Sequence, residues 1–112
     1  MKNEIKEGII IIYPEGNLLG EQSSAPVMET LNKCVAAGNK KAIFNMSGVK
    51  FVNSTGLGML LTGVSKMRKA EGEMVLCSLP DQMKKLMQMT KLETVFISHP
   101  DEPAAISYLK GT

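Results

Sequence analysis

The sequence predicts a single α/β domain in which a mixed β-sheet of about four to five strands is packed with about four α-helices. Short β-branched or apolar runs alternate along the chain with segments whose apolar residues recur at helical spacing. The 112 residues, 44% of them hydrophobic, suffice for one core and show no internal repeat or linker. We therefore expect residues 1–112 to form one domain, with right-handed crossovers between parallel strands.

The first predicted strand pair lies at the start of the chain. Ile5, between Glu4 and Lys6, is expected in the middle of a short edge strand. Residues 9–13 then predict a strand that ends at the turn Pro14-Glu15-Gly16. Because this second strand contains four consecutive isoleucines, we expect it to be covered on both faces.

The first helix is expected to begin near the capping pair Ser23-Ser24, with Pro26 close to its first position. Gly38-Asn39 supplies its end. The apolar stripe of this helix consists of Val27, Met28, Leu31, Cys34 and Val35.

A strand over residues 41–46 follows, and Ser47-Gly48 turns the chain into a second one over 49–52. The next helix ends at Gly72 and has a strong apolar stripe of Leu57, Leu60, Leu61, Val64 and Met67. Three further elements and a final helix complete the order: a strand over 73–78, a helix opened by Pro80, a last strand over 94–98, and a helix from Pro103.

Composition excludes several classes of function. Thirteen basic and 11 acidic side chains give a net charge of +2, too close to balance for a dedicated nucleic-acid binder. One histidine and two distant cysteines do not make a closed zinc site or a redox pair, so we expect no metal and no cofactor. The N-terminus is no signal peptide and the longest apolar run is residues 9–12, so we expect a cytoplasmic protein without membrane insertion.

The most distinctive segment is the turn over residues 53–58. Ser54 and Thr55 are expected at the start of a helix, where free N–H groups and the positive end of the helix dipole point outward. Two explanations for the segment remain open. Either Asn53 or Ser54 caps the helix and the glycines permit tight packing, or Gly56 and Gly58 allow a partner to approach closely.

Enzymatic explanations of this turn do not fit its residue types. No lysine follows the second glycine, as a phosphate-binding loop requires, and no glycine stands two residues before Ser54, as a nucleophile elbow requires. The single histidine, His99, is expected in an exposed loop, while Asp81 and Asp101 are expected to cap helices. We therefore predict no catalytic residues, and a small hydrolase or phosphotransferase using Ser54 or Thr55 is the weakest alternative.

Residues 51–61 (FVNSTGLGMLL) resemble the signature of STAS domains, the fold of sulfate transporters and anti-sigma factor antagonists. Residues 45–49 look like the family's Asp-Leu-Ser-x-Val strand end, and residues 14–18 look like its early Gly-x-Leu turn. Residues 72–76 and 91–97 are similar to the strand after the signature helix and to the last helix and strand. The resemblance covers nearly the whole chain.

The resemblance implies a bacterial, non-enzymatic regulator that acts by docking. Free-standing members bind an anti-sigma factor, typically a serine/threonine kinase, and thereby release a sigma factor for transcription. The kinase phosphorylates the second hydroxyl of the turn, which is Thr55 here with Ser54 as second choice, and a phosphatase reverses this. The expected partner-binding surface comprises Asn53, Ser54, Thr55, Gly56, Leu57, Gly58 and Met59.

Phosphate at a helix start should be tolerated, so we expect phosphorylation to preserve the fold and to prevent docking. Asn53, Asn45 and Leu19 stand where the family often carries acids, which leaves binding without phosphorylation open. One alternative is a STAS subunit that regulates the ATPase of a membrane transporter. That function would not need Thr55.

Two further groups of residues have more than one explanation. Met67, Met83 and Met87 are expected in the core. Met59 and Met89 lie off the apolar stripes, where they either form an adaptable docking surface or fill gaps. The basic group Lys66, Arg68 and Lys69 is either a solvated helix face or a surface that steers an acidic partner.

Overall fold

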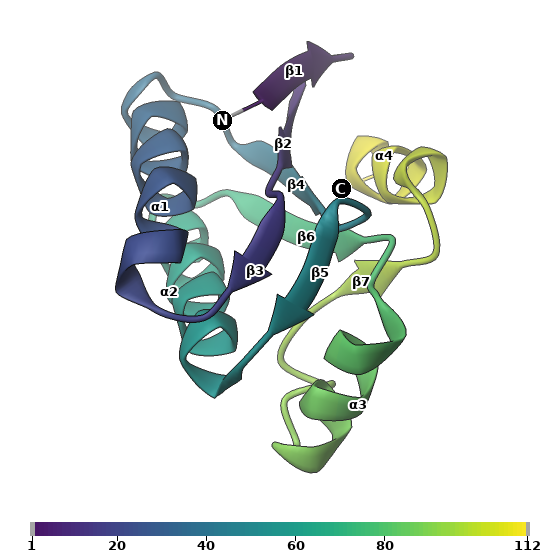
Figure 1. Ribbon diagram of the computed structural model, residues 1–112. Helices are drawn as coiled ribbons and strands as arrows, with labels where there is room; N and C mark the ends of the chain where they lie inside the picture. Colours follow the sequence, from purple (N-terminus) through teal and green to yellow (C-terminus); the bar gives the residue numbers. More distant parts are fainter. Residues whose placement is uncertain (1, 112) are drawn as a thin grey trace.

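Two β-sheets organise the computed structural model, which describes residues 2–111 and, for residues 21–24, the backbone only. The main sheet has the spatial order β1-β2-β4-β6-β7, in which β1 is antiparallel to β2 and the other pairs are parallel (Figure 1). Its strands are β1 (Lys2–Lys6), β2 (Ile9–Tyr13), β4 (Lys41–Asn45), β6 (Glu73–Cys77) and β7 (Ser98–His99). A smaller parallel pair consists of β3 (Gly16–Leu18) and β5 (Val49–Val52).

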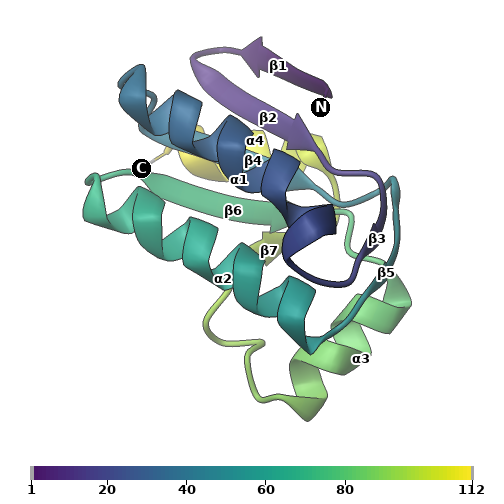
Figure 2. The ribbon, with the colours of Figure 1, turned by 60° about the vertical axis from the view of Figure 1, so that its left-hand side comes forward.

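Helices cover both faces of the main sheet. α1 and α2 lie side by side on one face, α4 lies on the other, and α3 packs beside β5 (Figures 1 and 2). The four helices are α1 (Glu21–Ala36), α2 (Ser54–Lys69), α3 (Asp81–Met89) and α4 (Glu102–Lys110). The predicted α/β architecture, a mixed sheet of four to five strands packed with four helices, is confirmed, and the small β3–β5 sheet is an addition to it.

The four isoleucines of β2 divide between two hydrophobic cores. Ile10 and Ile12 join the larger core beneath α1 and α2, whereas Ile9 and Ile11 join the smaller core beneath α4. This division follows from the alternation of side chains along a strand. The prediction that the strand is covered on both faces is therefore confirmed, as is the edge position of Ile5, which is 66% exposed.

Two predicted boundaries are wrong. α1 begins at Glu21, so Ser23 and Ser24 lie inside the helix and Pro26 is in its interior; the side chains of the predicted capping pair lie outside the described residues. The predicted strand over 94–98 is reduced to Ser98–His99, because residues 93–95 form a turn in which the Val95 N–H donates to Leu92 O. Phe96 is buried in the larger core from this irregular segment, and its burial produces the apolar pattern that suggested a strand.

The caps and core methionines mostly agree with expectation. Asp101 caps α4 through a 3.0 Å hydrogen bond from the Ala104 N–H. Asp81 is not a cap, because it is the first helical residue of α3 and follows Pro80, which has no side-chain donor or acceptor. The predicted core methionines Met67, Met83 and Met87 are all buried.

Candidate functional site

Asn53 connects the start of α2 to the loop that follows β3. Its Oδ1 accepts a 2.8 Å hydrogen bond from the Gly56 N–H, and its Nδ2 donates a 2.8 Å hydrogen bond to Leu19 O. Its own backbone N–H donates to Leu18 O at 3.2 Å. Of the two candidate caps, Asn53 is thus the N-cap, and its amide both accepts from the helix and donates to Leu19, which an ionised carboxylate cannot do.

Gly56 allows α2 to approach β3 closely. A Cβ added at this position would lie 2.0 Å from Leu18 O and 2.8 Å from Leu18 C, well inside van der Waals contact. Both Gly56 and the following Leu57 are buried. The packing explanation therefore accounts fully for the first glycine of the turn.

Gly58 has no such packing reason. A Cβ built on it meets nothing within 4 Å, and the residue is only half-buried. Glycine in a helix interior costs about 1 kcal/mol relative to alanine. The packing explanation does not account for the second glycine, and a bare backbone at the surface is what a closely approaching partner needs.

Ser54 and Thr55 form the exposed first turn of α2. Within the described residues, neither hydroxyl and neither backbone N–H of these two residues makes a hydrogen bond. Gly20 passes close to Thr55. A Cβ added to Gly20 would lie 3.9 Å from Thr55 Cγ2. The first turn carries no acid, so the positive end of the helix dipole is not neutralised there by a helix side chain.

Met59 lies one turn further along α2 and is half-buried against the larger core. It lines a hollow of about 560 Å³ between α1 and α2, shared with Met28 and with Ala25 and Ala36 of α1. The structure thus places Met59 in partial contact with solvent beside the turn, consistent with either explanation given for it.

Gln82 of α3 holds the end of β5, a role that nothing in the sequence indicated. Its Oε1 accepts from the Val52 N–H at 2.9 Å, and its Nε2 donates to Val52 O at 2.7 Å. The side chain therefore pairs with the free edge of β5 much as another strand would. It positions the residue immediately before Asn53.

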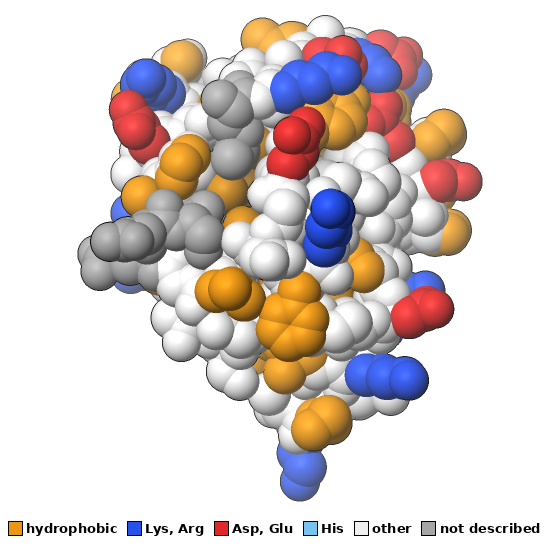
Figure 3. Space-filling model, in the orientation of Figure 1, with side chains coloured by type: hydrophobic (Ala, Val, Ile, Leu, Met, Phe, Trp, Pro, Cys, Tyr) orange, Lys and Arg blue, Asp and Glu red, His pale blue; other side chains and the backbone are white. Residues whose placement is uncertain are grey.

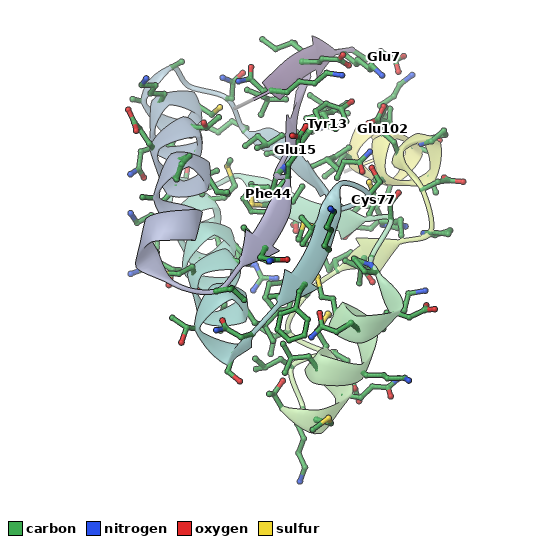
Figure 4. The ribbon with its side chains drawn as sticks, in the orientation of Figure 1. Glu7, Tyr13, Glu15, Phe44, Cys77 and Glu102 are labelled. Carbon is green, nitrogen blue, oxygen red and sulfur yellow. The ribbon has the colours of Figure 1, made fainter. Side chains whose placement is uncertain are left out.

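A second polar cluster joins the carboxyl ends of β2 and β4 to the start of α4. Glu102 Oε1 accepts from Tyr13 Oη at 2.7 Å and from Asn45 Nδ2 at 3.1 Å, while Oε2 accepts from Lys6 Nζ at 2.7 Å (Figure 4). Burial would raise the pKa of Glu102, but the hydrogen bonds from Lys6, Tyr13 and Asn45 outweigh it, and the pKa is lowered. Burial and the acceptor Glu102 raise the pKa of Tyr13.

The structure does not bring His99 to the turn. The prediction that it lies in an exposed loop is wrong: it belongs to β7, and its ring lies 4.9 Å from that of Tyr108 on α4. α4 covers the face of the sheet opposite to α2 (Figure 1). Among residues 2–111, no three His, Cys, Asp or Glu side chains are grouped so that they could hold a metal ion, and no helix is long and apolar enough to span a membrane.

Comparison with known families and curated proteins gives one consistent result. The family model described as the STAS domain matches residues 1–105. BtrV of Bordetella bronchiseptica, which carries the name of an anti-sigma factor antagonist, is 20% identical over 103 residues, covering 91% of this chain and 88% of BtrV.

Solved structures share the fold at low identity. A Thermotoga maritima protein named as an anti-sigma factor antagonist has a TM-score of 0.84 at 17% identity, covering 97% of this chain and 93% of its own. The phosphorylated form of the Bacillus protein SpoIIAA has a TM-score of 0.71 at 19% identity, with 96% of each chain covered. A sulfate transporter family protein from Wolinella succinogenes has a TM-score of 0.67 at 16% identity, covering 96% and 88%.

Proposed function

The chain belongs to the STAS domain family, and on that premise we propose that it is an anti-sigma factor antagonist switched by phosphorylation at Thr55. In the unphosphorylated form it binds a kinase-type anti-sigma factor and thereby releases a sigma factor. The antagonist class is supported by the name of BtrV, by that of the Thermotoga maritima protein and by that of the unphosphorylated form of SpoIIAA. The surface that binds the partner centres on residues 53–59.

The observation that carries this proposal is the hydroxyl of Thr55, which is exposed in the first turn of α2 and makes no hydrogen bond to the part of the chain that the structure describes. A kinase can reach it without unfolding the chain. In the transfer, the Thr55 oxygen forms a bond to the γ-phosphorus of ATP, the hydroxyl proton passes to a base of the kinase, and ADP leaves.

The added phosphate would carry about −1.5 to −2 charges. The backbone N–H groups of Ser54 and Thr55, which have no acceptor within the described residues, can donate to it at the positive end of α2. The fold therefore tolerates the phosphate, and its bulk and charge act on the docked partner instead. A serine/threonine phosphatase would restore the binding form.

The test uses the purified chain with each kinase-type anti-sigma factor of the organism that carries it, together with ATP. We expect phosphate on Thr55 by mass spectrometry, none on Thr55→Ala, and unchanged labelling of Ser54→Ala. We also expect the unphosphorylated chain to bind the kinase and the phosphorylated chain to dissociate from it. Labelling of Ser54 alone, or no binding by any of these kinases, would contradict the proposal.

A second candidate function is regulation of the ATPase of a membrane transporter, favoured by the structural likeness to the sulfate transporter family protein. This function requires docking but no phosphate. Thr55→Ala would then leave binding and ATPase stimulation intact, which separates the two candidates.

A further inference from the structure

Exposed apolar side chains gather next to the turn on a surface of which the sequence indicated only Met89. Within the described residues, four large hydrophobic side chains are exposed, and three of them lie near β5 and α3: Leu19 is 47% exposed, Phe51 44% and Met89 81%. Half-buried Leu86 completes this group. We call Leu19, Phe51, Leu86 and Met89 together the β5–α3 surface. Figure 3 shows hydrophobic side chains over β5 and over α3 on this face.

The strand pairing explains why Phe51 is exposed. Leu18 and Val52 are register partners and are both buried in the larger core. Because side chains alternate along a strand, Phe51 projects to the side opposite Val52, toward solvent. Leu19, the residue after the end of β3, is exposed as well.

α3 extends this surface beyond β5. The two hydrogen bonds between Gln82 and Val52 hold the helix against the strand. Gln82, Lys85, Leu86 and Met89 are spaced three or four residues apart, so they share one side of the helix. They line a hollow of about 420 Å³, into which a partner side chain would fit.

The surface is continuous with the turn proposed to be phosphorylated. Leu19 O accepts the hydrogen bond from Asn53, and the next residue, Gly20, passes beside Thr55. A protein that covers Thr55 and extends toward β5 therefore meets Leu19 first and then Phe51. This continuity favours a protein partner over a membrane as the occupant.

The charges around the surface are mostly basic. Four exposed lysines lie on β5, on α3 or in the turn after α3, and none forms an ion pair within the described residues: Lys50, Lys84, Lys85 and Lys91. Asp81 and Glu93 are the acids of the same segments. By contrast, Lys6, Lys33 and Lys110 elsewhere on the chain are paired with glutamates.

We infer that the β5–α3 surface docks an acidic, apolar surface of the anti-sigma factor, so that the partner is selected by Phe51, Met89 and the surrounding lysines as well as by the turn. This inference rests on the proposed function and adds the chemistry of the partner to it. Apolar contacts at the centre of an interface supply affinity, and complementary charges at its rim supply rate and specificity.

The experiment measures the dissociation constant of the anti-sigma factor for the full chain and four variants. Phe51→Ser/Met89→Ser removes the apolar centre, and Ile5→Ser, at the 66% exposed Ile5 of edge strand β1, is its control. Lys50→Glu/Lys85→Glu reverses the charge of the rim, and Lys110→Glu at the end of α4, on the other face of the main sheet, is its control. The charge variant alters only exposed side chains, so it tests the inference even if the serine variant folds poorly.

We expect Phe51→Ser/Met89→Ser to raise the dissociation constant about tenfold or more and Ile5→Ser to leave it within about twofold. Lys50→Glu/Lys85→Glu should raise it about fivefold at low salt and less at high salt, because screening weakens rim charges. Replacing acids of the partner by lysine should then restore binding to the charge variant.

Three outcomes would overturn the inference, and they differ from one another. If the wild-type chain binds its kinase and both variants bind equally well, the inference fails and the proposed function stands. If no anti-sigma factor binds the wild type, the proposed function fails and the inference with it. If the wild type sediments with phosphatidylglycerol vesicles, the serine variant does not, and both bind the kinase equally, the surface faces lipid instead.

Discussion

The side-chain amide of Asn53 donates a 2.8 Å hydrogen bond to the carbonyl oxygen of Leu19, while the oxygen of the same amide caps α2. One side chain thus fixes the first turn of α2 and the loop that passes beside Thr55. An aspartate, which the STAS resemblance would have placed here, can cap the helix but cannot donate to Leu19 when ionised. The departure from the family pattern therefore has a structural reason in this chain.

Asn53→Asp should lower the free energy of unfolding by about 1 kcal/mol at pH 7. The carboxylate gains from the helix dipole, but it loses a hydrogen bond and faces a carbonyl oxygen. Urea unfolding measures the change. Asn17→Asp, at an exposed residue of β3, is the matched control and should change stability by less than about 0.5 kcal/mol. Stability of Asn53→Asp equal to or above that of the wild type would contradict the predicted net loss.

Gly56→Ala and Gly58→Ala should have opposite effects on stability. A Cβ at Gly56 would lie 2.0 Å from Leu18 O, so this variant should lose about 3 kcal/mol or more. A Cβ at Gly58 meets open space, so this variant should gain up to about 1 kcal/mol from helix propensity. Urea unfolding of the two variants side by side provides the measurement.

The affinities of the same two variants for the anti-sigma factor test whether Gly58 belongs to the docking surface. If a partner approaches the bare backbone at Gly58, Gly58→Ala should bind the anti-sigma factor at least about tenfold more weakly although it is more stable. A more stable variant with unchanged affinity would remove Gly58 from the proposed docking surface.

The main elements of this fold could be predicted because they depend on local patterns. Four isoleucines in succession predicted a strand buried on both faces, and the polar and glycine residues of 53–58 predicted the capped start of α2. The sequence predicts only a turn where β3 forms, because a three-residue strand exists only through its pairing with β5, more than thirty residues later. The strand predicted over 94–98 is wrong because a buried Phe96 in an irregular segment produces the same apolar pattern as a strand.

The candidate site was predictable to a similar extent and for the same reason. The hydroxyls and the N-cap are contiguous in sequence, so the turn could be identified without a structure. Gln82, Leu19 and Phe51 belong to the site only because α3 and β3 pack beside β5, and no local pattern reports that packing. Their roles required the three-dimensional arrangement.

Asn45→Asp should destabilise the chain in a pH-dependent way. Asn45 is buried and donates to Glu102, so an aspartate there would place two carboxylates in contact. The two carboxylates repel each other, and the folded-state pKa of the pair rises above the unfolded values. The stability lost at pH 7 should therefore be about 1–3 kcal/mol and should diminish as the pH falls toward about 4, where a proton is shared.

The wild type should instead lose stability only at lower pH. The pKa of Glu102 is lowered by its hydrogen bonds from Lys6, Tyr13 and Asn45 against the cost of burial, so its contribution is present above its unfolded pKa and is lost as the pH falls through the folded one. Urea unfolding between about pH 3 and 7 compares the two chains. The control is Asn32→Asp, at an exposed residue that accepts from Lys66, and it should show no such pH-dependent loss. A deficit of Asn45→Asp that does not change with pH would contradict the shared proton.

Thr55→Glu should separate the fold from the docking function most directly. A carboxylate in the first turn of α2 lies at the positive end of the dipole, near N–H groups without an acceptor in the described residues, so the free energy of unfolding should rise by about 0.3–1 kcal/mol. The same carboxylate would lie against a docked partner, so affinity for the anti-sigma factor should fall at least about tenfold. Thr55→Gln, nearly equal in size and uncharged, is the matched control and should lose less affinity and gain no stability. Urea unfolding and titration calorimetry of the three chains give both quantities. If Thr55→Glu bound the anti-sigma factor as tightly as the wild type, negative charge at residue 55 could not be what prevents binding.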